Sequence, residues 1–303
     1  MNVPPTTDNI SYRDGLLYSI LAYTTWGLGP IYFKAIAEVP PSEVLAHRIV
    51  WSIVFLFAAS LVLKNTGEIK AALTSWKALK YLGITTVLIA VNWYSFIWSI
   101  ENRQVLQASL GYFINPLITV LLGALFLKEK LRRPAQISII FAAVGVVLII
   151  AKSAVLPVAG LVLAVTFAFY ALLRKIAPVE AVPGLTVETT LLGPLALGYL
   201  FWLGHNNAIV FGNTTTGINL LLAAAGPVTS LPLIWFAKGT RRLQLSTVGF
   251  LQYISPSLHF LLAVAIYGEP FGVVHLLAFL FIWTGLAIFT LDSFKRARKN
   301  HRS

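Results

Sequence analysis

Glu43, His47 and Arg48 form the one compact cluster of ionisable side chains within an apolar segment of this sequence. Glu43 and His47 are four residues apart, so a helix would place them one turn apart on the same face. Because an unperturbed imidazole titrates near neutral pH, this pair could change charge under physiological conditions. The cluster predicts either a titratable gate or a solvated helix start that is held by an intrahelical pair.

Other chemistry-bearing groups are isolated. Glu188 lies about one turn inside a later apolar segment, where it predicts a cavity carboxylate or a headgroup contact. An intramembrane enzyme acting on lipid could combine His47 with Glu43 or Glu188, but no nucleophile motif or metal-ligand spacing accompanies them. The chain has no cysteine, which excludes disulfides, thiolate nucleophiles and thiolate metal sites. No catalytic residue, cofactor or metal site is predicted.

Aromatic and amide side chains near the centres of apolar segments predict a cavity. Tyr and Trp each carry a polar group that seldom stays unpaired in hydrocarbon, so several of them should face the interior of a helix bundle. An aromatic cavity favours flat, amphipathic or cationic solutes over inorganic ions. The predicted lining is Tyr23, Trp26, Asn92, Trp93, Tyr112, Asn115, Tyr170, Gln252 and Tyr253.

Two prolines, Pro116 and Pro256, stand 140 residues apart inside apolar segments. Proline removes a backbone donor and crowds the carbonyl four residues back, which kinks the helix. Matched interruptions of this kind, in two halves of opposite orientation, indicate a binding site at the bilayer midplane. A kink that only shapes packing is the alternative, although the paired polar neighbours Asn115 and Ser255 favour a cavity lining.

The same spacing of 140 residues relates Glu129 to Glu269 and Gly145 to Gly285, which indicates a duplication. Both carboxylates fall just after an apolar segment, so they are predicted to make helix-end or loop contacts. Five apolar segments separate the copies, an odd number, so the second copy must enter a membrane with opposite orientation. This arrangement is typical of transporters.

The elements that carry these residues are predicted to be membrane helices, because 57% of residues are hydrophobic, 11% are charged and the mean hydropathy is +0.79. The fold class is all-α, with ten helices as two inverted five-helix repeats around a central cavity. Residues 1–14 are predicted to form a disordered lead-in, 15–151 the first repeat, 152–291 the second repeat and 292–303 a basic tail. The helices are expected at 15–37, 43–63, 78–100, 106–127, 134–151, 157–174, 184–203, 217–237, 246–267 and 272–291.

Basic residues predict the orientation. Nineteen of the 23 lysines and arginines, from Arg13 to Arg302, fall on one side of the predicted helices. The positive-inside rule therefore puts both termini in the cytoplasm. The run from Lys295 to Arg302 is predicted to contact anionic lipid. Nucleic-acid binding is not predicted, because the charges are divided among short loops.

Several short runs of residues carry a family resemblance: Tyr23, Trp26 and Gly27; Tyr32, Phe33 and Lys34; His47, Arg48, Trp51 and Ser52; Asn92 and Trp93; the run from Ala108 to Leu117; and Phe250, Gln252, Tyr253 and Ile254. With them the chain resembles the EamA group of the drug/metabolite transporter superfamily over nearly its whole length. The resemblance implies ten helices in two inverted halves around a central cavity, a location in the bacterial inner membrane, and export of small metabolites.

The predicted function is a carrier of a small organic metabolite, amino-acid-like or drug-like, that works by alternating access. A non-transporting membrane scaffold and the lipid-modifying enzyme are the alternatives. No mid-span acidic pair is present, so neither proton nor sodium coupling is predicted. The small-molecule substrate and the lipid bilayer are the predicted partners, and no oligomeric state is predicted.

Overall fold

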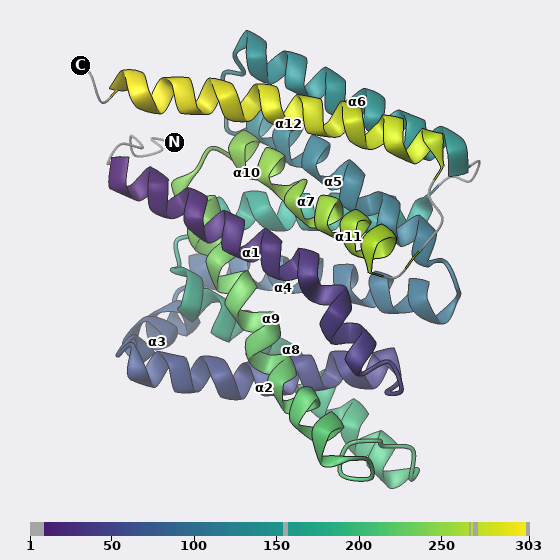
Figure 1. Cartoon of the computed structure of the whole chain (residues 1–303). Coiled ribbons are helices and arrows are strands. Elements are labelled where there is room, and N and C mark those ends of the chain that lie inside the picture. The colour runs from purple at the N-terminus through teal and green to yellow at the C-terminus, as the bar shows by residue number, and fades with distance from the viewer. Residues whose placement is uncertain (1–8, 154–156, 267, 269–271, 301–303) are drawn as a thin grey trace.

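The computed structural model describes residues 9–153, 157–266, 268 and 272–300, and all regular structure in these ranges is helical. Nine segments are long and apolar enough to cross a membrane, and α1, with 27 residues, is long enough to be the tenth (Figure 1). The helices are α1 (Asn9–Ala35), α2 (Pro41–Val62), α3 (Thr66–Thr74), α4 (Trp76–Glu101), α5 (Val105–Phe126), α6 (Arg133–Ser153), α7 (Val158–Ile176), α8 (Ala181–His205), α9 (Thr216–Arg242), α10 (Leu245–Gln252), α11 (Ile254–Ala265) and α12 (Val273–Asn300).

Besides the short helix α3, for which the sequence predicts no element, the structure departs from the predicted elements in three places. α1 begins at Asn9, so residues 9–14 are helical where a disordered lead-in is predicted, while residues 1–8 lie outside the described ranges. The basic tail from residue 292 continues α12 as far as Asn300. The ninth predicted span is broken at Tyr253 into α10 and α11, three residues before Pro256, whereas α5 runs unbroken through Pro116.

Helices α6 and α12 lie side by side along one flank of the bundle and make a reciprocal contact (Figure 1). A Cβ on Gly145 would lie 2.6 Å from the carbonyl oxygen of Ala278, and one on Gly285 would lie 2.7 Å from that of Ser138. Ser138 and Ala278 are themselves 140 residues apart. Such an exchange of partners is what a two-fold relation between duplicated elements produces.

Equivalent hydrogen bonds repeat the relation in the middle of the bundle. The Asn115 amide in α5 donates to the Ala164 carbonyl of α7 at 2.7 Å, and the Ser255 hydroxyl in α11 donates to the Tyr23 carbonyl of α1 at 2.7 Å. Asn115 and Ser255 therefore have the same structural role in the two copies. Each forms a hydrogen bond from a proline-bearing helix to the first helix of the other copy.

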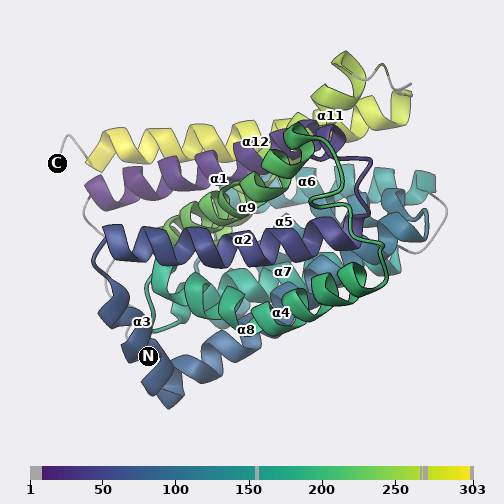
Figure 2. The same cartoon turned by 90° about the horizontal axis from the view of Figure 1, so that it is seen from below.

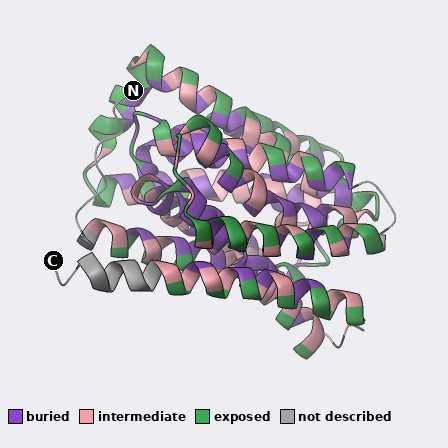
Figure 3. Ribbon diagram, turned by 90° about the horizontal axis from the view of Figure 1, so that it is seen from above, coloured by how far each residue is buried: buried purple, intermediate pink, exposed green. Residues whose placement is uncertain are grey.

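Many large apolar side chains of the described residues are exposed, and Figure 3 shows exposed positions along the outer faces of the helices. Val62 is 81% exposed and Phe201 is 78% exposed. In water these side chains would be costly to expose in such number, but in a bilayer they face hydrocarbon. The protein is a multi-pass membrane protein.

Successive long helices run in alternate directions, so the linkers gather at two ends of the bundle (Figures 1 and 2). The linkers 62–76, 126–133, 176–181 and 242–245 form one end, here called the basic end, together with the start of α1 and the end of α12. The linkers 35–41, 101–105 and 205–216 lie at the opposite end. Arg174 is an exception to the predicted loop location of the basic residues, because it is buried in the last turn of α7.

Candidate functional site

The site begins with the way α11 packs on α1. Pro30 lies inside α1 and has no N–H to offer the carbonyl of Trp26, four residues earlier. The His259 Nε2 of α11 lies 3.1 Å from that carbonyl oxygen, so a protonated Nε2 supplies the missing donor. Together with the bond from Ser255 to Tyr23, this contact holds α11 on α1.

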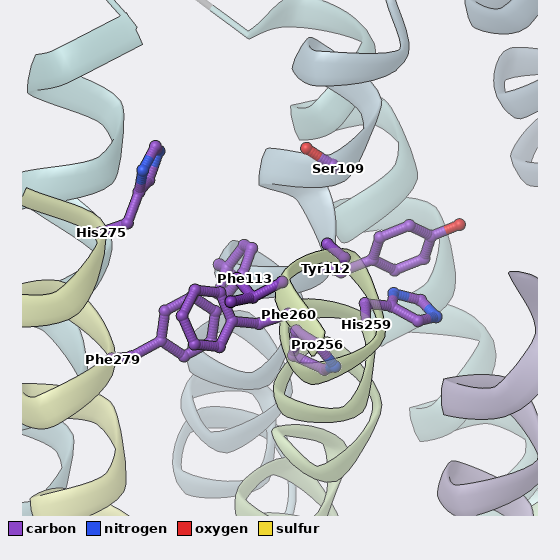
Figure 4. Close-up of a pocket in the computed structure, with 10 residues that line it drawn as sticks. Ser109, Tyr112, Phe113, Pro256, His259, Phe260, His275 and Phe279 are labelled. Atoms are coloured by element: carbon purple, nitrogen blue, oxygen red, sulfur yellow. The ribbon is translucent and has the colours of Figure 1, made fainter. Parts of the chain in front are cut away.

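A pocket of about 250 Å³ opens between α11, α5 and α12 (Figure 4). The rings of Tyr112 and His259 lie on one side of α11, and those of Phe113, Phe260 and Phe279 lie on the other. Tyr112 and His259 meet edge to face with 5.8 Å between ring centroids. The pocket is lined by Ser109, Tyr112, Phe113, Pro256, His259, Phe260, Ala263, Val264, His275 and Phe279. It lies in the half of the bundle away from the basic end.

The other half of the same helix pair is closed. Gly249 of α10 packs on α5 so tightly that a Cβ would lie 2.8 Å from the Pro116 carbonyl oxygen and 2.7 Å from Val120. The Glu129 carboxylate accepts hydrogen bonds from the N–H groups of Leu245 and Ser246 at 2.6 and 2.9 Å, and from the Ser246 hydroxyl at 2.8 Å. Negative charge is favoured at a helix N-terminus, so Glu129 fastens α10 to the end of α5. This confirms that Glu129 makes a helix-end contact; Glu269 lies outside the described residues.

Arg48 reaches from α2 into the centre of the bundle. Its Nε donates to the Thr229 hydroxyl of α9 at 2.9 Å. Its Cζ lies 5.2 Å from the ring centroid of Trp93 in α4 and 5.5 Å from that of Phe33 in α1.

The aromatic members of the predicted lining are divided between a packed cluster and the open pocket. Tyr23, Trp26 and Tyr170 join Phe167 and Phe236 in one set of ring contacts, with centroids 5.1–6.2 Å apart. The Tyr23 hydroxyl and the Gln252 Nε2 are buried without hydrogen-bond partners. Of the nine predicted lining residues, Tyr112 lines the pocket.

The remaining polar members bridge helices. The Asn92 amide of α4 donates to the Leu163 carbonyl and the Thr166 hydroxyl of α7 at 2.9 and 3.0 Å. The Tyr253 hydroxyl donates to the Phe113 carbonyl at 3.3 Å. These groups, like Asn115, hold helices together, and a role in contacting a solute stays a prediction.

The Glu43–His47 pair is present in α2, but it is buried, whereas one of the two predictions was a solvated helix start. The closest approach of His47 Nε2 to Glu43 Oε1 is 3.7 Å, and both side chains are buried. The Glu43 carboxylate accepts hydrogen bonds from the N–H groups of Val210 at 3.0 Å and Phe211 at 3.0 Å. The pair therefore anchors the linker between α8 and α9 to α2, which explains why it is covered.

Glu188 lies neither at a headgroup nor in an open cavity, so both predicted locations are wrong. It is fully buried, and it accepts hydrogen bonds from Thr85 at 2.5 Å, Tyr170 at 3.1 Å and Arg174 at 3.3 Å. Arg174 is buried as well, so the two charges compensate each other inside the protein. The network ties α4, α7 and α8 together near the basic end.

The sequence does not identify Thr229 or Phe33 as neighbours of Arg48. Thr229 is 181 residues from Arg48, and nothing in its local pattern distinguishes it from other threonines in membrane helices. Phe33 belongs to the residues that carry the family resemblance, and this is the signal that the sequence offers for it. The position of Arg48 itself, a charged residue inside an apolar helix, is the stronger indication of a functional site.

The comparisons with known proteins agree with this geometry. Residues 13–151 match the model of the EamA-like transporter family. Protein RarD of Salmonella typhimurium is 45% identical over 287 residues, which cover 95% of this chain and 98% of the relative. The chain belongs to the EamA-like transporter family. This family lies within the drug/metabolite transporter superfamily, as the resemblance implied.

Other EamA-like relatives extend over the same length. An uncharacterized transporter of Vibrio cholerae is 43% identical and covers 98% of this chain and 99% of its own. The chloramphenicol-sensitive protein RarD of Pseudomonas aeruginosa is 30% identical and covers 95% of this chain and 97% of its own. A protein of known crystal structure, 20% identical, aligns with a TM-score of 0.72 over 92% of this chain and 98% of that one, which shows a shared EamA-like fold.

Proposed function

We propose that this EamA-like protein carries a small organic metabolite or amphipathic compound across the bacterial inner membrane by alternating access. The observation that carries the proposal is the one-sided opening around the two prolines. Gly249 packs on Pro116 at the basic end, while the residues 140 positions away from them, Ser109 and Pro256, line the pocket on the opposite side. One copy of the same contact is closed and the other is open.

The orientation follows from charge. Most lysines and arginines lie at the basic end, which by the positive-inside rule faces the cytoplasm together with both termini. The pocket then opens away from the cytoplasm. If the Gly249–Pro116 contact opened and the Ser109–Pro256 contact closed, a bound solute would become accessible from the cytoplasm instead.

The test is solute flux into vesicles that contain the purified full-length protein. A panel of radiolabelled amino acids, nucleosides and amphipathic drugs is supplied, with protein-free vesicles and the variant Gly249→Leu as controls. We expect saturable flux of at least one solute, and its loss in Gly249→Leu, because a leucine cannot fit against the Pro116 carbonyl. Flux at the leak level for the whole panel would contradict the proposal.

The same preparation separates the alternatives. A lipid-modifying enzyme predicts turnover of labelled lipid by the purified protein, whereas a carrier leaves the lipid intact. If the protein is a scaffold, the double variant Asn115→Ala, Tyr253→Phe should leave every flux unchanged. For a carrier we expect this double variant to reduce the flux, because the two side chains hold the proline-bearing helices to their neighbours.

A further inference from the structure

Two cationic side chains of α9 lie over one aromatic ring of α1. The Nζ of Lys238 is 5.3 Å from the ring centroid of Tyr18, and the Cζ of Arg242 is 5.5 Å from the same centroid. Lys238 and Arg242 are four residues apart, so they share one face at the end of α9. All three side chains are partly exposed. They form a charged surface at the basic end, here called the Tyr18 patch.

The Tyr18 patch carries two positive charges without a matching carboxylate. Among the residues that the structure describes, three ion pairs form within 4.0 Å, and none includes Lys238 or Arg242. Arg242 donates from Nη1 to the Lys238 carbonyl oxygen at 3.0 Å, which leaves its Nε and Nη2 for another acceptor. Like charges four residues apart on a helix repel each other. An anion that contacts both side chains would relieve this repulsion.

Close packing of α1 on α9 holds the Tyr18 patch in shape. A Cβ on Gly15 would lie 2.9 Å from the Cβ of Arg242, and a Cβ on Gly239 would lie 3.1 Å from the Gly15 carbonyl oxygen. Glycine at these positions lets the two backbones approach closely. The ring and the two cations are therefore fixed relative to each other before any ligand arrives, which lowers the entropic cost of binding.

The exposed face of α1 places the Tyr18 patch at the boundary between water and hydrocarbon. Arg13 and Asp14 are exposed one turn before Tyr18, whereas Leu17 is 55% exposed and Ile20 is 42% exposed. Tyrosine is enriched at this boundary, where the phosphates of phospholipids also lie. The positive-inside rule assigns the basic end to the cytoplasmic leaflet, which carries anionic lipid. A lipid beside α1 would have its phosphate level with the two cations.

We propose that the Tyr18 patch binds the headgroup of an anionic phospholipid. The free Nε and Nη2 of Arg242 match two oxygens of one phosphate, and Lys238 adds a second positive charge. The Tyr18 hydroxyl can donate a further hydrogen bond. The acyl chains then follow the exposed apolar side chains of α1. This site is separate from the basic tail of the chain, and it exists whether or not the protein carries a solute.

The experiment measures lipid binding to the purified full-length protein in a nonionic detergent, by native mass spectrometry and by thermal shift during lipid titration. Phosphatidylglycerol has one net negative charge, phosphatidylcholine has a phosphate but no net charge, and glycerol 3-phosphate has a phosphate but no acyl chains. The variants are Lys238→Gln, Arg242→Gln and the two combined. Lys77→Gln combined with Lys80→Gln is the matched control, because both lysines are exposed at the start of α4, also at the basic end.

We expect saturable binding of phosphatidylglycerol, and binding of phosphatidylcholine that is weaker by about tenfold or more. Each cation beside an anionic headgroup contributes about fivefold in affinity, so each single variant should weaken phosphatidylglycerol binding about fivefold and the double variant roughly 25-fold. The control should match the unaltered protein, although it loses the same net charge. The single variants suffice if the double variant fails to fold.

Equal binding of the two phospholipids, or undiminished binding of phosphatidylglycerol in the folded variants of Lys238 and Arg242, would overturn the inference. An equal loss in the control would show that total charge attracts the lipid, without a site, and would overturn it too. Glycerol 3-phosphate that binds as tightly as phosphatidylglycerol would assign the Tyr18 patch to a soluble phosphate compound instead. Absence of saturable binding of phosphatidylglycerol would also count against it.

Discussion

The closure at the basic end offers the sharpest test, through the change Glu129→Gln. The Glu129 carboxylate accepts three hydrogen bonds at the start of α10. A hydrogen bond to a charged group contributes about 1.5–3 kcal/mol, and glutamine keeps an oxygen acceptor but loses the charge. Because Glu129 is half-buried, the lower end of that range applies. We expect the closed contact to weaken by about 1.5 kcal/mol, which changes its equilibrium constant about tenfold.

The absence of cysteine makes the assay direct. Thr247→Cys places a reporter in α10 at the closed contact, where the side chain is buried, and Ala263→Cys places one in the pocket. In reconstituted protein, Glu129→Gln should raise the labelling rate of the Thr247→Cys reporter by an impermeant maleimide about tenfold and lower that of the Ala263→Cys reporter. Glu101→Gln, at an exposed position of the opposite end, is the control.

Two results would refute this reasoning. Unchanged labelling at both reporters would mean that Glu129 does not hold the contact shut. A rise at both reporters would mean that the bundle loosens as a whole, without the exchange between ends that alternating access requires.

Three further predictions concern stability: two are measured as the thermal midpoint of the purified protein in detergent, and that for Gly111→Leu as the yield of folded protein. Glu188→Gln should lower the midpoint strongly, since an unpaired buried Arg174 costs about 3–5 kcal/mol, and Arg174→Leu combined with Glu188→Leu should recover most of the loss. Gly111→Leu should prevent folded expression, because a Cβ there would lie 2.5 Å from a carbonyl oxygen of α7. Glu180→Gln should change the midpoint little, because its pair with Arg241 is solvent-exposed and contributes less than about 1 kcal/mol.

Hydropathy and proline spacing predict most of the fold, because membrane helices satisfy their own backbone and their apolar faces are visible in the sequence. The structure bears out the all-helical class and, approximately, the ten spans. α3 was missed because it has 9 residues and lies at the basic end, where neither length nor hydropathy distinguishes it from a linker.

The candidate site was less predictable, because it depends on contacts between distant segments. The sequence predicts a cavity or headgroup location for Glu188, because nothing in it shows that α7 and α8 pack face to face and pair Glu188 with Arg174. The burial of Glu43 likewise depends on the 205–216 linker folding over it. The positions of Pro116 and Pro256 were informative because proline acts on its own backbone, whatever its neighbours.

The different treatment of the two prolines has an energetic consequence. α5 remains continuous through Pro116, whereas the equivalent segment of the second copy is interrupted at Tyr253 between α10 and α11. The backbone geometry therefore differs between the two copies. Gly249 and Ser109, at corresponding positions, also differ in bulk. Under the proposed alternating access, the inward-facing and outward-facing forms would therefore differ in free energy even with nothing bound. The empty protein would then favour one side, and a solute or a gradient would act against or along that preference.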